Sequence, residues 1–181
     1  ENSRVTVIET GAGVCHVYVE KQADLDKAVN IGVNAKVSRP SVCNSMDCLL
    51  VDKKVAPGFL RRLRAPMEEY EVEMFAEPKA YHLLKGYPYL KKAAKEDFAR
   101  EFLSLKCAVK VVNDIDEALA HIREYSTKHS EAIVSKDKKQ CERFLAEVDA
   151  AAVYTNASTR FTDGEELELD AEIGISTQKL Q

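Results

Sequence analysis

The cysteine best placed for chemistry lies in the segment KVSRPSVCNSMDCLLV, residues 36–51. Pro40 pushes Arg39 out of helical backbone, and small polar residues flank Cys43, so we expect Cys43 to lie on a turn. A turn can expose the thiol and direct backbone N–H groups at the sulfur, which favours the nucleophilic thiolate. The same pattern also fits a turn cysteine without a chemical role, and local sequence leaves both interpretations open.

The remaining cysteines and the histidines carry weaker signals. Four cysteines lie in apolar patterns and are predicted to be buried: Cys15, Cys48, Cys107 and Cys141. No CxxC pair occurs, so zinc ribbons and thioredoxin-type chemistry have no support. The histidines are scattered without ligand spacing: His16, His82, His121 and His129. His121 is expected to be solvated on a polar helix face, and no motif places a histidine beside Cys43 for hydrolysis.

Two further polar residues lie next to predicted strands. Glu9 ends the apolar run VTVIE, so its carboxylate is expected to point into a cleft. The segment NASTRFTDG, residues 156–164, begins just past another strand, and ligands bind at such strand ends in open α/β sheets. Arg160 could fork onto a carboxylate or phosphate there, or be a surface arginine in a polar loop. The glycines of ETGAG, residues 9–13, indicate a turn and lack the dinucleotide-binding spacing.

Composition narrows the class of protein. The 181 residues are 45% hydrophobic and 31% charged, enough for one domain with its own core. The net charge of −4 with dispersed basic residues argues against a nucleic-acid surface, and the apolar runs are too short to predict a transmembrane helix. The opening ENSRVTVIET predicts no secretory signal, so we expect reduced thiols and a cytoplasmic protein. It also lacks an initiator Met, and we expect a piece of a longer chain.

Strand and helix patterns alternate along the sequence. The predicted strands cover residues 5–9, 15–20, 48–53, 107–112, 131–135 and 151–156. The predicted helices begin near Asp24, Pro57, Glu96, Ile115 and Asp137; the one at Glu96 reaches Leu103, and the last turns Cys141, Phe144, Leu145 and Val148 inward. We predict strand and loop for residues 72–92 and no helix in the tail. This order predicts an α/β fold over residues 1–181, a three-layer αβα sandwich with a largely parallel sheet.

Five segments, in this order, resemble one known family. They are VIETGAGVCHVYVEKQADLDKAV, NAKVSRPSVCNSMDCLLV, EFLSLKCAVKVV, VDAAAVYTNASTRFTDG and AEIGISTQKL. Together they are similar to the gamma-glutamyl phosphate reductases of proline biosynthesis, a branch of the aldehyde dehydrogenase superfamily. RPSVCN and NASTRFTDG are the most specific matches. The resemblance implies a catalytic domain whose dinucleotide-binding domain is absent from this chain, so the fragment alone is expected to be inactive and to bind NADPH poorly.

The resemblance also implies residue roles. Cys43 would be the nucleophile in the NADPH-dependent reduction of L-glutamyl 5-phosphate to L-glutamate 5-semialdehyde, through a thioester. Glu9 matches a glutamate that acts as general base in oxidising relatives, and Glu101 matches one that reaches the nicotinamide ribose. The implied substrate-binding residues are Arg39, Asn156, Ser158, Thr159 and Arg160. The cofactor would be NADPH/NADP, and no metal is expected. The expected partners are a glutamate 5-kinase and further copies of the chain. No binding to nucleic acid or to a membrane is expected.

The chain departs from the family pattern in places. Asp47 and Cys48 stand where Glu and Thr are common. Glu168 and Asp170 stand where glycine is usual, which puts the geometry of that loop in question. Two alternatives remain open from sequence: an aldehyde dehydrogenase-like domain for another acyl substrate, and a non-catalytic binding module that retains the fold.

Overall fold

Seven strands form one sheet in the computed structural model, which describes residues 12–171 and 173–177. The strands are β1 (Cys15–Val19), β2 (Met46–Asp52), β3 (Glu73–Ala76), β4 (Leu90–Lys92), β5 (Lys106–Val112), β6 (Ser130–Val134) and β7 (Ala152–Thr155). Their order across the sheet is β4-β3-β5-β2-β1-β6-β7, and each described pairing is parallel. The predicted strand 5–9, and with it Glu9, lies outside the described residues.

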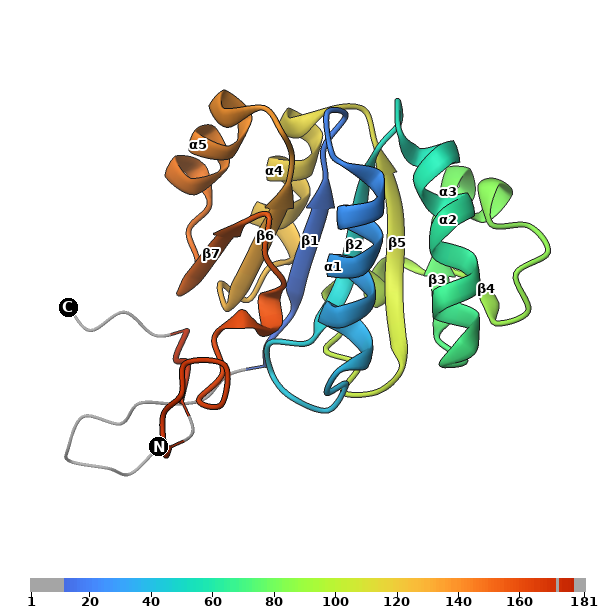
Figure 1. Cartoon of the computed structure of the whole chain (residues 1–181). Helices are drawn as coiled ribbons and strands as arrows, with labels where there is room; N and C mark the ends of the chain where they lie inside the picture. The colour runs from blue at the N-terminus through green and yellow to red at the C-terminus, as the bar shows by residue number, and fades with distance from the viewer. Residues whose placement is uncertain (1–11, 172, 178–181) are drawn as a thin grey trace.

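Helices cover both faces of this sheet (Figure 1). They are α1 (Leu25–Val37), α2 (Ala56–Glu69), α3 (Pro78–Leu83), α4 (Ile115–Tyr125) and α5 (Lys138–Glu147), with 3-10 turns η1 (Lys95–Ala99) and η2 (Thr159–Phe161). One core cluster lies under α1, α2 and α3, and a second lies under α4 and α5. The predicted three-layer αβα sandwich is therefore confirmed. Among the described residues, no helix has the length and hydropathy needed to cross a membrane.

The central strands are buried on both sides because each face meets a helical layer. Every residue of β1 and β2 is buried. Side chains alternate along a strand, so Val17 and Val19 join the core under α1 while Tyr18 joins the core under α4. Neighbouring residues on β1 therefore face opposite helical layers.

Side-chain caps begin three helices near the starting points that the sequence predicts. Asp24 accepts the N–H of Lys27, Asp114 accepts that of Glu117, and Asp137 accepts those of Lys139 and Gln140. Helix α1 ends at Val37, just before Pro40, as the proline predicts. Local sequence thus sets these boundaries.

The prediction of strand and loop for residues 72–92 is incomplete because α3 lies between β3 and β4. Glu77 begins this helix: its carboxylate accepts the N–H groups of Lys79 and Ala80. Pro78 then occupies the first helical position, where its missing N–H costs nothing. A helix of only six residues leaves too little apolar periodicity to be recognised.

The predicted helix at residues 96–103 is wrong beyond its first turn. Only η1 forms, and the chain after Arg100 is irregular. The Phe102 N–H donates to the Asp47 carboxylate at 3.0 Å instead of to a helical carbonyl, and Leu103 has φ of +50°. A contact with a residue more than fifty positions away therefore overrides the local helical pattern.

His121 is buried, contrary to the predicted solvated position. It lies on α4 against the sheet, with its ring packed on Phe98 and Tyr125 at centroid distances of 5.3 and 4.5 Å. Burial, with the nearby charges of His16 and Lys110, lowers its pKa to about 2, so the ring is neutral. The sequence did not predict this burial, because a single histidine on a helix does not show which face of the helix packs on the sheet.

The tail after η2 follows turns, as predicted. Glu168 has φ of +53°, in the left-handed region that glycine favours. The sequence singled out this position because glycine is usual there in the resembled family. The departure from glycine therefore falls on a residue whose backbone does adopt a glycine-like conformation.

Helix α5 is anchored on the sheet mainly by Phe144, which is fully buried. The prediction that Leu145 also faces inward is wrong, since it is 47% exposed, and Cys141 is only partly buried. Val148, just past the helix, is buried as predicted. The inward stripe of α5 is narrower than its apolar residues suggest.

We expect Phe144→Ala to lower the free energy of unfolding by about 3–5 kcal/mol, because a large buried side chain leaves a cavity. Leu145→Ala on the same helix is the control and should cost less than about 1 kcal/mol, since its side chain is half exposed. Urea unfolding followed by far-UV circular dichroism measures both. Equal losses for the two variants would contradict this orientation of α5.

Candidate active site

Cys43 lies on an exposed turn between α1 and β2, as the sequence predicts. The turn is closed by the Val42 N–H donating to Arg39 and the Ser45 N–H donating to Val42. Because β2 begins at Met46, the thiol lies at the amino end of the central strand. Ser45 and Asn44, on the far side of the turn, are already buried. The turn is therefore fixed at its base and open at the sulfur.

Gly13 holds the segment before β1 directly against this turn. A Cβ atom on Gly13 would lie 2.2 Å from the Cys43 carbonyl oxygen, so only glycine fits. The Gly13 N–H donates to Glu101 Oε1 at 2.9 Å. The fold thus brings Glu101, one of the predicted site residues, beside Cys43 from a distant part of the chain.

Cys15 supports the turn from beneath. Its thiol donates to the Cys43 carbonyl oxygen at 3.2 Å and lies 3.7 Å from His129 Nδ1. Burial, with the charges of Glu131 and Asp47, raises the pKa of Cys15 well above its usual value. Cys15 is thus a neutral thiol that helps to fix the backbone of Cys43, a role its strand pattern did not signal.

Competing effects act on the Cys43 thiol. Burial raises its pKa, and the Glu101 carboxylate adds to the increase. The backbone N–H groups of Cys43 and Asn44, together with Arg160, act in the opposite direction. The N–H groups expected to favour thiolate are therefore present, but the net pKa is raised. Removing the Glu101 charge is the simplest change that would favour the thiolate.

Arg160 joins the tail to the Cys43 turn. Its guanidinium donates to the side chains of Asn44 and Asp163, and Asn44 in turn donates to the Thr162 carbonyl at 2.9 Å. The Asp163 carboxylate also lies 3.8 Å from the Arg39 guanidinium. Asn44 and Asp163 were not predicted as site residues, although each is close in sequence to one that was. Arg160 is thus buried, with Nη1 and Nη2 hydrogen-bonded to the protein and Nε without a partner among the described residues.

A pocket of about 390 Å³ lies beside this network. It is lined by Asn34, Ser38, Arg39, Ser158, Arg160, Phe161, Asp163, Glu165 and Glu166. Three predicted substrate-binding residues, Arg39, Ser158 and Arg160, therefore meet at one place. Arg39 is half exposed, so its guanidinium is the more accessible of the two. The pocket carries both cationic and carboxylate groups.

Two other predicted residues are placed differently. Thr159 is fully buried at the start of η2. Asn156 lies at the carboxyl end of β7, where its side chain accepts the Ser135 N–H at 3.1 Å and donates to the Ser135 carbonyl at 2.9 Å. Its side chain thus ties β7 to the residue that follows β6. This contact lies at the carboxyl ends of the strands, whereas Cys43 lies at the amino end of β2.

Comparison with known proteins supplies the remaining observations. No protein-family model matches the chain. A gamma-glutamyl phosphate reductase of Clostridium acetobutylicum is 54% identical over 180 residues, which is 99% of this chain and 42% of that protein. The crystal structure of the Thermotoga maritima gamma-glutamyl phosphate reductase matches with a TM-score of 0.91 and 45% identity, covering 98% of this chain and 42% of that one.

A more distant structure shows the fold alone. An acetylating aldehyde dehydrogenase of Geobacillus thermoglucosidasius matches with a TM-score of 0.67 at 20% identity, covering 91% of this chain and 44% of that one. The chain spans about two fifths of the length of the curated relatives it matches. The resemblance in the sequence motifs is thereby confirmed: the chain is homologous, along nearly its whole length, to a segment of the gamma-glutamyl phosphate reductases.

Proposed function

We propose that this chain is the catalytic domain of an NADPH-dependent gamma-glutamyl phosphate reductase. It would reduce L-glutamyl 5-phosphate to L-glutamate 5-semialdehyde and release phosphate. The observation that carries the proposal is the exposed Cys43 thiol on a turn that is fixed from below and bordered by a charged pocket. The homology over 99% of the chain supports the choice of reaction.

Cys43 would act as the nucleophile. Its thiolate attacks the acyl carbon, the carbon–oxygen bond to phosphate breaks, and phosphate leaves with the electron pair, so that a thioester forms. This divides one difficult step into two easier ones. The backbone N–H of Cys43 would stabilise the oxyanion, and loss of one such donor typically costs about 10²–10³ in rate.

The nicotinamide cofactor, when bound, would supply the hydride that adds to the thioester carbon, which becomes an aldehyde once the carbon–sulfur bond breaks. Cys43 then leaves with the electron pair of the carbon–sulfur bond and is regenerated as thiolate. Glu101 fits the predicted contact with the cofactor ribose, because its carboxylate lies beside Cys43 and can accept hydroxyl donors. Its contact with Gly13 would keep it in place.

The pocket would hold the amino-acid head of the substrate. An amino group and a carboxylate need opposite charges, which the arginines and acidic residues of the pocket provide. We assign the carboxylate contact to Arg39, because Arg160 is engaged by Asn44 and Asp163. Ser158 and Thr159 would shape the loop, Arg160 would position Asn44, and Asn156 would act at a distance by fixing β7.

The setting follows from the chemistry of the substrate. An acyl phosphate hydrolyses readily, so a glutamate 5-kinase in the same compartment would have to supply it, with direct transfer as an advantage. All five cysteines are free, which agrees with a reducing compartment such as the cytoplasm. Assembly of the protein into homo-oligomers is part of the same proposal.

The decisive assay uses the protein that contains this chain at the full length of its relatives. We expect NADPH to form from NADP and glutamate semialdehyde only when phosphate is present, and we expect Cys43→Ala to abolish it. Arg39→Met should raise the KM for the semialdehyde by about tenfold or more, since it removes a charged contact. NADPH formation that ignores phosphate, or that survives Cys43→Ala, would overturn the proposal.

We expect Cys43 to alkylate at least about tenfold faster than Cys15, Cys48 and Cys107, because Cys43 is an exposed residue and those three are buried. Its rate should keep rising up to pH 9 without a plateau, since its pKa is raised and the thiolate fraction still increases there. Timed labelling with iodoacetamide and peptide mass spectrometry measures this. Cys141 is the partly buried control; if Cys43 reacts no faster than Cys141, the nucleophile is misassigned.

We expect Glu101→Gln to speed the alkylation of Cys43 about two- to fivefold at pH 7.5. The amide oxygen still accepts the Gly13 N–H, while the charge that raises the pKa of Cys43 is lost. Glu96→Gln, an exposed change on η1, is the control and should leave the rate unchanged. A slower rate in Glu101→Gln would mean that Glu101 acts on Cys43 through geometry and not through charge.

A further inference from the structure

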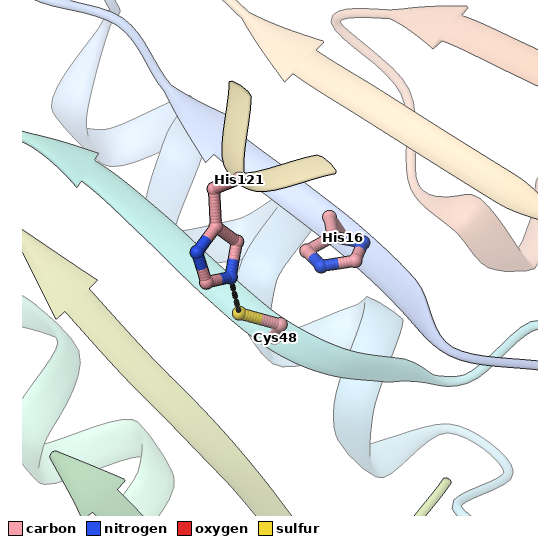
Figure 2. Close-up of side chains that lie close together, drawn as sticks. All are labelled: His16, Cys48 and His121. Atoms are coloured by element: carbon pink, nitrogen blue, oxygen red, sulfur yellow. Dashed lines mark hydrogen bonds between the residues drawn. The ribbon is translucent and has the colours of Figure 1, made fainter. Parts of the chain in front are cut away.

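Three buried side chains meet between the sheet and α4. They are His16 on β1, Cys48 on β2 and His121 on α4 (Figure 2). One donor atom from each lies within 4.8 Å of the other two, and all three residues are buried. The spacing in the sequence gave no sign of this cluster, because each residue comes from a different element.

His16 is held in the orientation of a ligating imidazole. Its Nδ1 lies 3.0 Å from Glu131 Oε2, and the same oxygen accepts the His16 backbone N–H at 2.8 Å. Its other nitrogen, Nε2, is buried and has no hydrogen-bond partner within the described structure. Figure 2 shows one ring nitrogen of His16 turned towards the Cys48 sulfur. A carboxylate behind one nitrogen and an open second nitrogen is the usual arrangement of a metal-binding histidine.

Cys48 and His121 present their ligand atoms at a distance that suits a metal ion. Cys48 Sγ lies 3.6 Å from His121 Nε2. A tetrahedral centre with metal–sulfur and metal–nitrogen bonds of zinc length separates those two ligand atoms by about 3.6 Å. The Cys48 and His121 atoms are therefore already at the separation that such an ion requires.

A divalent cation would have to displace a proton from His16: burial lowers the pKa of this side chain, but the charges of Glu131 and Cys48 outweigh burial and raise it to about 10. The anionic groups of the cluster would then offset the charge of the ion. Ligation by the Cys48 thiolate supplies one negative charge, and Glu131 supplies a second behind His16. Ser126 donates to the other oxygen of Glu131, which fixes the carboxylate. Thiolate and imidazole ligands together are typical of zinc and similar thiophilic ions. Phe98 and Tyr125 pack on His121 and shield this side of the cluster.

We propose that His16, Cys48 and His121 form a buried binding site for one zinc-like thiophilic divalent cation, with Glu131 orienting His16. The fourth tetrahedral position would be taken by water or a small anion. Because the ligands come from β1, β2 and α4, the ion would clamp α4 to the two central strands. This site is separate from the Cys43 pocket and does not depend on the proposed reaction.

Lys110 limits the affinity of the site. Its Nζ lies 3.4 Å from His121 Nδ1 and 3.5 Å from the Glu117 carboxylate. A lysine that donates to Nδ1 leaves the proton on Nε2, the nitrogen that must bind the ion. Binding therefore requires Lys110 to turn fully towards Glu117, which its partly exposed side chain allows. Replacing Lys110 should therefore strengthen binding of the ion while leaving all three ligand residues unchanged.

The test uses cobalt(II) as a spectroscopic probe on the reduced 181-residue chain carrying Cys43→Ser, so that the exposed thiol cannot bind. We expect one Co²⁺ per chain, with a sulfur-to-cobalt charge-transfer band that Zn²⁺ removes by displacement. Zn²⁺ should raise the Tm by about 5 °C at concentrations well above its Kd. The band should be lost in Cys48→Ser and kept in Cys141→Ser, the matched control.

A second variant guards against misfolding of a ligand mutant. Lys110→Met should tighten Co²⁺ binding about threefold or more, whereas Lys53→Met, at a lysine hydrogen-bonded to Asn113, should leave it unchanged. Absence of the charge-transfer band in the parent chain would overturn the proposal. So would a band that persists in Cys48→Ser, or an affinity that falls in Lys110→Met.

Discussion

The contact of Gly13 with the Cys43 carbonyl is the constraint on which the site depends. Since a Cβ there would lie 2.2 Å from that oxygen, the two chain segments that enter β1 and β2 touch backbone to backbone. The Gly13 N–H donates to the Glu101 carboxylate, and the Cys15 thiol donates to the same Cys43 carbonyl oxygen. The exposed Cys43 residue is therefore on a turn that is held against the segments that enter the two central strands.

Arg160 holds the same turn from the side of the tail. A guanidinium in a polar loop suggests a ligand contact, yet Nη1 and Nη2 of Arg160 donate to Asn44 and Asp163, and its buried Nε has no hydrogen-bond partner among the described residues. A buried charge is tolerated when it is paired and hydrogen-bonded in this way. The interaction ties the tail to the residue after Cys43, so the position of the proposed nucleophile and the shape of the pocket are coupled. Arg39, which is half exposed, is the arginine that we propose to contact the substrate.

Local signals in the sequence predicted much of this fold. The caps at Asp24, Asp114 and Asp137 and the turn at Cys43 each depend on residues within a few positions. The features that escaped prediction depend on distant partners: Phe102 binds Asp47, and His121 is buried by the sheet. Periodicity records which face of an element is apolar but not what packs against it. The five motifs spread along the chain indicated the resemblance to gamma-glutamyl phosphate reductases, because together they sample several distant segments.

Strand alternation places the two cysteine-containing sites back to back. Cys15 and His16 are adjacent on β1, yet Cys15 contacts the Cys43 turn whereas His16 faces Cys48 and α4. Cys43 and Cys48 are likewise five residues apart, one on a turn and one inside a strand. Identical thiols thus have different surroundings: Cys43 is exposed and near backbone N–H groups, which agrees with its proposed role as nucleophile, whereas Cys48 is buried beside two imidazoles, which agrees with its proposed role as an ion ligand. An ion that clamps β1 to β2 would also stiffen the strand whose entry residue Gly13 fixes the nucleophile.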